Sequence, residues 1–296
     1  MPVFATDGGE SVIAVASYEM TLETVAQEGG CDLVLMSLPY ENARSYSAAV
    51  SWKFEDYHNL GRWTFEALRP GGWCLMVLDG PVREWRKGKG TERSLTPFRV
   101  LLDWADQVGF RVPDRLAYGR FGIPGEYKGR FRNDWEPCFW FQRPGAEGHF
   151  DKWAIAEEAK KGPQVGNVCR DMQPDGKIRV RRQTGKASEL GKKQRGTLWN
   201  YDSVGNGQEE SEAIATKHPA RFSTRFAEDA IKCFSAPGAL VCDPFVGSGT
   251  TAVASVRNDR RFVGGDLLAR KEDKKPWAQV AHERVLGELA RLKAVS

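Results

Sequence analysis

The stretch VCDPFVGSGTTAVASVRNDRRFVGGDL, residues 241–267, constrains the fold of this chain more than any other part of its sequence. A strand-like apolar run ends at Asp243, and a short loop with Gly247 and Gly249 precedes a helical pattern that begins at Thr250. A second apolar run ends at Asp266, 17 residues after Gly249. A strand, a glycine-rich turn, a helix and a further strand form a unit typical of parallel sheets.

The same unit predicts a binding site for a nucleoside cofactor. Glycines allow a sharp turn and a close approach of the backbone to a ligand, and the amides at the start of the helix point toward that ligand. An acid at the tip of the next strand, as Asp266 is here, can accept hydrogen bonds from both hydroxyls of a ribose. A tight turn without a ligand would explain the two glycines alone, but it would not explain the acid.

Strand-like and helical patterns alternate through most of the remaining chain. This alternation predicts an α/β fold, a doubly wound and mostly parallel sheet with helices on both faces. The expected strands are residues 11–16, 31–36, 73–79 and 136–144, and the expected helices include 57–68, 96–110 and 277–295.

The pattern breaks down in the middle of the chain. We therefore expect three parts: 1–144 and 213–296 of one α/β domain, and an inserted lobe at 145–212. Between Gly176 and Asn200, eight basic residues stand against one acidic residue, Glu189. Such a basic stripe suggests a polyanionic partner, although a solvated basic loop with no ligand is the alternative.

Composition excludes several other classes of protein. No apolar run approaches the roughly 18 residues that span a bilayer, and the first thirty residues lack the zones of a signal peptide, so we expect a cytoplasmic protein. The six cysteines form no CxxC pair and the chain has only four histidines. Disulfides and a metal site are therefore not expected.

Three short motifs resemble those of one family. DPFVGSGTT (243–251) resembles the S-adenosylmethionine (AdoMet) motif of DNA amino-methyltransferases, and SLPY (37–40) resembles their catalytic motif, an acid, Asn or Ser followed by two prolines and an aromatic. KHPARF (217–222) is similar to their segment that helps to hold the methionine end of AdoMet. The order of the motifs resembles the beta class. Leu38 stands where the family usually has a proline, but Pro39 still biases it toward extended geometry.

The resemblance implies a Rossmann-like methyltransferase fold, AdoMet as cofactor and the inserted lobe as the target-recognition region. The Ser37 hydroxyl and the Leu38 carbonyl would accept hydrogen bonds from an exocyclic amine, and Tyr40, after Pro39, would stack on a base flipped out of the duplex. The implied cofactor-binding residues are Asp243, Pro244, Phe245, Gly247, Ser248, Gly249, Thr250, Thr251, Asp266, His218 and Pro219. The expected DNA-binding residues are Arg44, Lys177, Arg179, Arg181, Arg182, Lys192, Lys193 and Arg195.

Several alternatives remain at this point. Arg44 could instead support the catalytic loop, and His218 could be a helix cap or a packing residue. In the resembled family, Ser at the first catalytic position usually accompanies N4 methylation of cytosine and Asp accompanies N6 methylation of adenine, so Ser37 favours cytosine. The same chemistry on RNA, or a fold that only binds nucleic acid, is also compatible with the sequence. A homodimer and a cognate restriction enzyme are both open.

Overall fold

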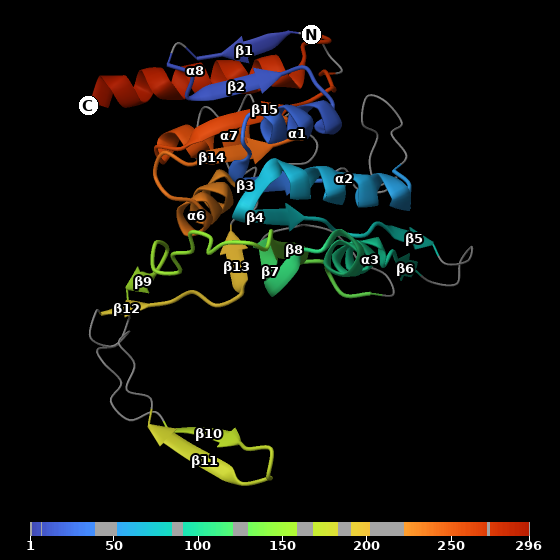
Figure 1. Cartoon of the computed structure of the whole chain (residues 1–296), viewed down its shortest axis with the longest axis vertical. Coiled ribbons are helices and arrows are strands. Elements are labelled where there is room, and N and C mark those ends of the chain that lie inside the picture. The colour runs from blue at the N-terminus through green and yellow to red at the C-terminus, as the bar shows by residue number, and fades with distance from the viewer. Residues whose placement is uncertain are drawn as a thin grey trace. The chain divides into compact units, whose positions relative to one another are not determined.

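The structure is a computed structural model that describes most of the chain in two units (Figure 1). The larger unit comprises Met1–Phe150 and Thr197–Ser296, and the smaller unit comprises Asp151–Gly196. The described residues are 2–6, 8–38, 52–84, 91–120, 130–158, 168–182, 191–201, 222–270 and 273–295.

The larger unit is built on one mixed sheet, in which the described residues form nine strands. Five neighbouring strands are parallel, from β2 through β15, β14 and β3 to β4. At one side β1 is antiparallel to β2, and at the other β8 is antiparallel to both β4 and β7, while β13 is parallel to β7. The order is β1 (Val3–Ala5), β2 (Ser11–Ala14), β15 (Arg261–Gly265), β14 (Leu240–Asp243), β3 (Cys31–Ser37), β4 (Leu68–Val77), β8 (Trp135–Gln142), β7 (Arg111–Arg120) and β13 (Leu198–Tyr201).

This topology collects many loops at one edge of the sheet. Because β8 is antiparallel to both of its neighbours, β7 and β13 run in the same direction as the five central strands. The carboxyl ends of β2, β15, β14, β3, β4, β7 and β13 therefore share one edge, which we call the carboxyl edge. In such sheets, ligands bind at the carboxyl edge where the strand order reverses direction. That point lies between β14, which connects onward to β15, and β3, which connects onward to β4.

Helices cover both faces because side chains alternate along buried strands. On β4, Cys74 and Met76 belong to a core that includes buried residues of α1, α2 and α3, whereas Trp73 faces α6, with its ring 5.8 Å from that of Phe234. Helix α7 packs beside α6 and against β15, and α8 packs beside α7 and against β2. The helices are α1 (Tyr18–Gln27), α2 (Phe54–Ala67), α3 (Thr96–Asp103), α6 (Thr224–Phe234), α7 (Thr250–Arg257) and α8 (Trp277–Val295).

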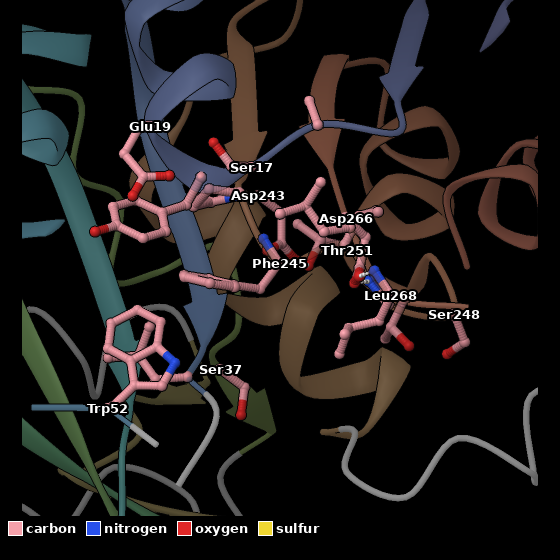
Figure 2. A pocket seen from close by; sticks show the side chains of 18 of the residues that line it. Ser17, Glu19, Ser37, Trp52, Asp243, Phe245, Ser248, Thr251, Asp266 and Leu268 are labelled. Atoms are coloured by element: carbon pink, nitrogen blue, oxygen red, sulfur yellow. Dashed lines mark hydrogen bonds between the residues drawn. The ribbon is translucent and has the colours of Figure 1, made fainter. Parts of the chain in front are cut away.

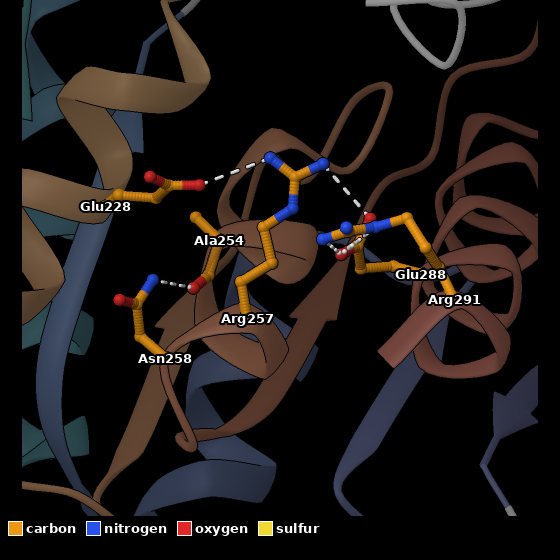
Figure 3. Close-up of polar contacts among 6 residues, drawn as sticks. All are labelled: Glu228, Ala254, Arg257, Asn258, Glu288 and Arg291. Carbon is orange, nitrogen blue, oxygen red and sulfur yellow. Dashed lines mark hydrogen bonds and ion pairs between the residues drawn. The ribbon is translucent and has the colours of Figure 1, made fainter. Parts of the chain in front are cut away.

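An ion-pair network joins the three helices α6, α7 and α8 (Figure 3). Arg257 of α7 donates to Glu228 of α6 at 3.2 Å and to Glu288 of α8 at 3.0 Å, and Arg291 also donates to Glu288. Burial alone would raise the pKa of Glu288, but the hydrogen bonds and charges of the two arginines outweigh it and hold that pKa below its usual value. The network thus fixes α8 against the helix that follows the glycine loop.

The predicted α/β fold is confirmed, and the structure differs from the expected elements in several details. The helix expected over 96–110 is α-helical only to Asp103 and continues as a π-helical turn, Trp104–Val108, which Gly109 ends at φ 97°. The predicted strand at 136–144 is antiparallel to its neighbours, so the sheet is mixed. A hairpin of β5 (Val82–Glu84) and β6 (Thr91–Arg93) follows β4 and was not predicted.

The expected lobe boundaries, 145–212, are too wide. Residues 145–150 belong to the larger unit, and β13 joins its main sheet because Trp199 and Tyr201 are buried there, 5% and 4% exposed. The ring of Phe226 packs on both.

The smaller unit consists of two short antiparallel pairs in its described residues. One pairs β9 (Glu157–Glu158) with β12 (Lys192–Lys193). The other is a hairpin of β10 (Val168–Met172) and β11 (Ile178–Arg182), whose turn contains Gly176 at φ 77°. Within the described parts of the whole chain, no helix has the length and apolar character needed to cross a membrane.

Candidate active site

A cavity of about 410 Å³ opens at the carboxyl edge where the strand order reverses. This volume is typical of small-molecule sites. The glycine loop after β14 forms one wall, and the end of β3 contributes Ser37 and Leu38. Figure 2 shows Ser37 and Trp52 toward one end of the opening, and Asp266, Ser248 and Leu268 toward the other. The cavity therefore brings Ser37 and Leu38 of SLPY together with the glycine loop, although about 200 residues separate them in the chain.

Asp243 holds the glycine loop in place from the end of β14. Its side chain is buried, and Thr251 Oγ1 donates a hydrogen bond to its Oδ2 at 2.6 Å. The backbone N–H of Phe245 donates to Oδ1 at 3.0 Å. Burial raises the pKa of Asp243 to about 7, although these two hydrogen bonds act in the opposite direction. The carboxylate thus connects the loop to the first turn of α7.

Asp266 directly follows the neighbouring strand, β15, and contacts the same loop. Its Oδ2 accepts from the N–H of Gly247 at 2.9 Å, and its Oδ1 accepts from the N–H of Leu268 at 2.7 Å. Burial raises the pKa of Asp266 to about 6, against the effect of these two donors. Each carboxylate oxygen has a further lone pair, so a ligand in the cavity can still donate hydrogen bonds to Asp266.

Gly247 and Gly249 both adopt positive φ, at 48° and 87°, as the loop requires. The reason for glycine at position 249 differs from the one expected. A Cβ there would lie 2.8 Å from the Cα and Cβ of Ala281, so the close neighbour is helix α8 and not a ligand.

Gly249→Ala is therefore expected to lower the free energy of unfolding without any ligand present, by more than the roughly 1 kcal/mol of positive-φ strain alone. Thermal unfolding of the apo protein measures this effect. Gly238→Ala is the matched control, because Gly238 has φ 77° and no atom within 4 Å of an added Cβ. Equal losses of stability in the two variants would contradict the role assigned to Ala281.

Ser37 ends β3, and its neighbour Leu38 explains the departure from the family motif. The Leu38 side chain is 1% exposed and belongs to the core under α1 and α2. Its N–H donates to the carbonyl oxygen of Val77 at 3.3 Å, a bond that proline could not make. Leucine thus continues the β3–β4 ladder by one residue and adds an apolar contact.

Several cavity residues were not predicted from the sequence. The turn between β2 and α1 contributes Ala16 and Ser17, and the start of α1 contributes Tyr18 and Glu19. The rings of Tyr18, Trp52 and Phe245 lie 5.6–5.7 Å apart. Burial raises the pKa of Tyr18, so its phenol stays protonated. The available signal was the position of SYE directly after a strand-like run. The remaining unpredicted lining residues are Asp56, Leu267 and Leu268, whereas Val246 and Phe222, which also line the cavity, belong to the two motifs that resemble AdoMet-binding segments.

Most of the other predicted cofactor residues line the cavity, and the rest either do not line it or lie outside the described residues. Pro244, Phe245, Gly247, Ser248, Thr250 and Thr251 line the cavity together with Asp243 and Asp266. Gly249 is not among the lining residues. Pro39, Tyr40, Arg44, His218 and Pro219 lie outside the described residues.

The predicted DNA-binding residues all lie in the smaller unit, apart from Arg44. Lys177 and Arg179 are exposed on the β10–β11 hairpin, and Arg181 and Arg182 belong to β11. Lys192 and Lys193 are exposed but lie opposite Glu158 and Glu157 in the β9–β12 ladder. The Arg195 side chain is only 14% exposed and forms an ion pair with Glu157 at 3.8 Å, which weakens its case as a DNA contact.

Comparison with known proteins identifies the class. A family model described as DNA methylase, for N6 and N4 methyltransferases, matches residues 31–272. The chain therefore belongs to this DNA methylase family and is a DNA methyltransferase. Among curated relatives, the orphan methyltransferase M.BamHII of Bacillus amyloliquefaciens is 28% identical over 267 residues, which cover 87% of this chain and 90% of M.BamHII.

Two solved structures share the fold. The cytosine-N4-specific PvuII DNA methyltransferase aligns with a TM-score of 0.62 at 17% identity, covering 95% of this chain and 92% of that one. The protein TTHA0409 of Thermus thermophilus, solved with S-adenosyl-L-methionine, aligns with a TM-score of 0.58 at 19% identity, covering 93% of each chain.

Proposed function

We propose that this chain transfers a methyl group from AdoMet to the exocyclic amino group of a flipped DNA base, with N4 of cytosine as the favoured acceptor. One observation carries the proposal. A single cavity is lined at one side by the glycine loop and Asp266, and at the other by Ser37 and Leu38. A cofactor and an acceptor base bound there would meet without any rearrangement of the sheet.

The cavity residues fit AdoMet. The ribose hydroxyls would donate to Asp266, and the rings of Tyr18, Trp52 and Phe245 offer apolar surface. The backbone of the glycine loop can approach the ligand closely. When bound, AdoMet supplies a methyl group on a positively charged sulfur atom. The carboxyl groups of Asp243 and Asp266, each of which accepts an N–H of the glycine loop, would supply negative charge at the side of the cavity that would hold AdoMet.

The side of the cavity lined by Ser37 and Leu38 would bind the exocyclic amine of the target base. The lone pair of an exocyclic amine is delocalised into the base and is therefore a poor nucleophile. Acceptors placed around the N–H groups can hold the nitrogen pyramidal and return the lone pair to it. We assign this role to the Ser37 hydroxyl and the Leu38 carbonyl. Alignment of the nitrogen with the methyl group then accounts for most of the rate enhancement.

Ser37 supports cytosine over adenine because of the association of serine with N4 methylation in the resembled family. A hydroxyl can accept from either amine, so N6 of adenine is the second candidate acceptor. The family model covers both activities.

The smaller unit is proposed to bind the DNA backbone. Replacing Arg179, Arg181 and Arg182 with alanine should weaken DNA binding and lower the slope of log K against log salt by up to about 0.9 for each lost phosphate contact. Fluorescence anisotropy at several salt concentrations measures the slope. Arg195→Ala is the matched control and should change the slope less, because Arg195 already pairs with Glu157. A wild-type slope in the triple variant would mean that the stripe is a solvated surface.

AdoMet affinity is expected to depend on pH. Asp266 and Asp243, with pKa values raised by burial to about 6 and about 7, gain protons as the pH falls from 8 to 5. Protonation removes negative charge near a cationic ligand and occupies ribose acceptors, so affinity should decrease through this range. The sign for folding is opposite, because the folded chain holds these protons more tightly than the unfolded chain, and this contribution to stability declines as pH rises.

Calorimetric titration of AdoMet between pH 5.5 and 8 measures the affinity. The Asp266→Asn variant should show a flatter profile below pH 7, since only one of the two carboxyls still titrates. An affinity for the wild type that is constant over this range would contradict the assignment of both carboxyls to the cofactor site.

Incorporation of tritiated methyl groups into duplex DNA, single-stranded DNA and RNA tests the proposal. Transfer to duplex DNA is expected. Preferred transfer to RNA would replace the proposed substrate, and absence of transfer to all three would favour a fold that only binds nucleic acid. A cytoplasmic location is part of the proposal, because the enzyme acts where the DNA is.

A further inference from the structure

The segment that enters β8 lies at the same edge of the sheet as the candidate active site. Strand β7 ends at the carboxyl edge, and β8 begins there because it is antiparallel to β7. Residues 130–134, with the sequence RFRND, directly precede β8 and are described by the structure. None of these five residues belongs to a described helix or strand or lines the cavity.

One side chain of this segment is almost fully accessible. Phe131 is 97% exposed, more than any other large apolar side chain among the described residues, and Arg132 beside it is exposed as well. A single exposed apolar residue is by itself unremarkable. Here, however, the phenylalanine stands between two arginines, Arg130 and Arg132. An aromatic ring with adjacent cations is suited to a partner that offers both stacked rings and phosphates.

A hydrogen-bonded cluster holds this segment against the loop that follows β4, the neighbour of β3. Asn133 Nδ2 donates to Asp79 Oδ2 at 3.0 Å, and Arg93 of the β5–β6 hairpin donates to both oxygens of Asp79 at 2.7–2.8 Å. Asp79 lies two residues beyond Val77, which is the partner of Ser37 in the β3–β4 ladder. The Asp79 side chain is only 12% exposed. The cluster thus anchors Phe131, two residues from Asn133, near the strand that presents Ser37.

We propose that Phe131 stacks into the DNA duplex at the position that the flipped base vacates, with Arg130 and Arg132 on the flanking phosphates. The inference rests on the proposed function, because it assumes a duplex substrate whose target base leaves the stack. Flipping costs unstacking and unpairing energy, and an aromatic ring that replaces the lost stacking contacts offsets part of this cost. The role is one of positioning, since Phe131 does not contact the reacting atoms.

The test compares two DNA substrates in single-turnover methylation with saturating AdoMet. In one the target base is paired, and in the other it lies opposite an abasic site, where flipping is already easier. Phe131→Ala is expected to lower the rate on the paired substrate by tenfold or more and to leave the rate on the abasic substrate within about twofold. Phe131→Trp should retain most of the activity on both substrates.

Leu286→Ala is the matched control, because Leu286 is an exposed apolar residue of α8, 45% exposed. It should leave both rates unchanged. An unchanged rate for Phe131→Ala on paired DNA would overturn the inference, and so would an equal loss on both substrates. Failure of the proposed function is distinguishable, because the wild-type protein would then methylate neither duplex. Fluorescence of 2-aminopurine at the target position gives a second readout, and it should rise less in Phe131→Ala than in wild type.

Discussion

Ser37→Ala is expected to lower the rate of DNA methylation by tenfold or more while AdoMet affinity stays within about twofold. The hydroxyl lies at the end of β3, on the side of the cavity away from Asp266, so its loss should affect the acceptor base and not the cofactor. Without this acceptor the amine is no longer held pyramidal, and a tenfold effect corresponds to about 1.4 kcal/mol of transition-state stabilisation. Single-turnover kinetics with saturating AdoMet measure the rate, and calorimetry measures the affinity.

Ser37→Thr is the conservative control, because it keeps a hydroxyl and should keep part of the activity. Tyr40→Ala is expected to behave as Ser37→Ala does, by loss of stacking on the flipped base. Full activity in both alanine variants would show that SLPY is not the catalytic loop.

Asp266→Ala is expected to weaken AdoMet binding by tenfold or more, about 1.4 kcal/mol. The carboxylate is the proposed acceptor for the ribose hydroxyls, and it also accepts the N–H groups of Gly247 and Leu268. The alanine variant therefore loses the proposed ligand contact and also the hydrogen bonds that hold the glycine loop in place. Isothermal calorimetry measures the affinity, and thermal unfolding of the apo variant shows whether the fold survives.

Asp273→Ala is the matched control for this variant. Asp273 lies in the segment after β15 with its side chain 50% exposed, and its ion pair is with Arg270. Its replacement should change AdoMet affinity by less than twofold. Wild-type affinity in Asp266→Ala would remove the ribose assignment and, with it, the reason to place AdoMet in this cavity.

The unit from β14 to β15 was predictable because its signals are local. A buried strand, two glycines, a helix and an acid follow one another within 27 residues, and the structure places Asp243, Gly247 and Asp266 in one hydrogen-bonded loop. The reason for Gly249 was not predictable. It depends on Ala281, 32 residues later in the chain, and the sequence contains no local sign that α8 packs there.

Contacts that depend on the order of strands in the sheet could not be predicted from the sequence. The turn after β2 lines the cavity only because β2 pairs with β15, which joins Ser11 to Phe262 across most of the chain. The same applies to β13, which was assigned to the lobe because its four residues carry no period that distinguishes a sheet edge from a loop. Local sequence patterns thus predicted the motifs. The pairing of strands that are distant in the chain determines which other residues surround those motifs.

The most direct test of the central claim is the identity of the methylated nucleoside. Duplex DNA is incubated with the protein and AdoMet, digested to nucleosides and analysed by mass spectrometry against reference compounds. The account predicts N4-methylcytosine, formed in wild-type reactions and reduced in those with Ser37→Ala. N6-methyladenine alone would overturn the choice of base but preserve the amine chemistry. Methylation on carbon only, or no methylated nucleoside at all, would contradict the assignment of this cavity to amino methylation of DNA.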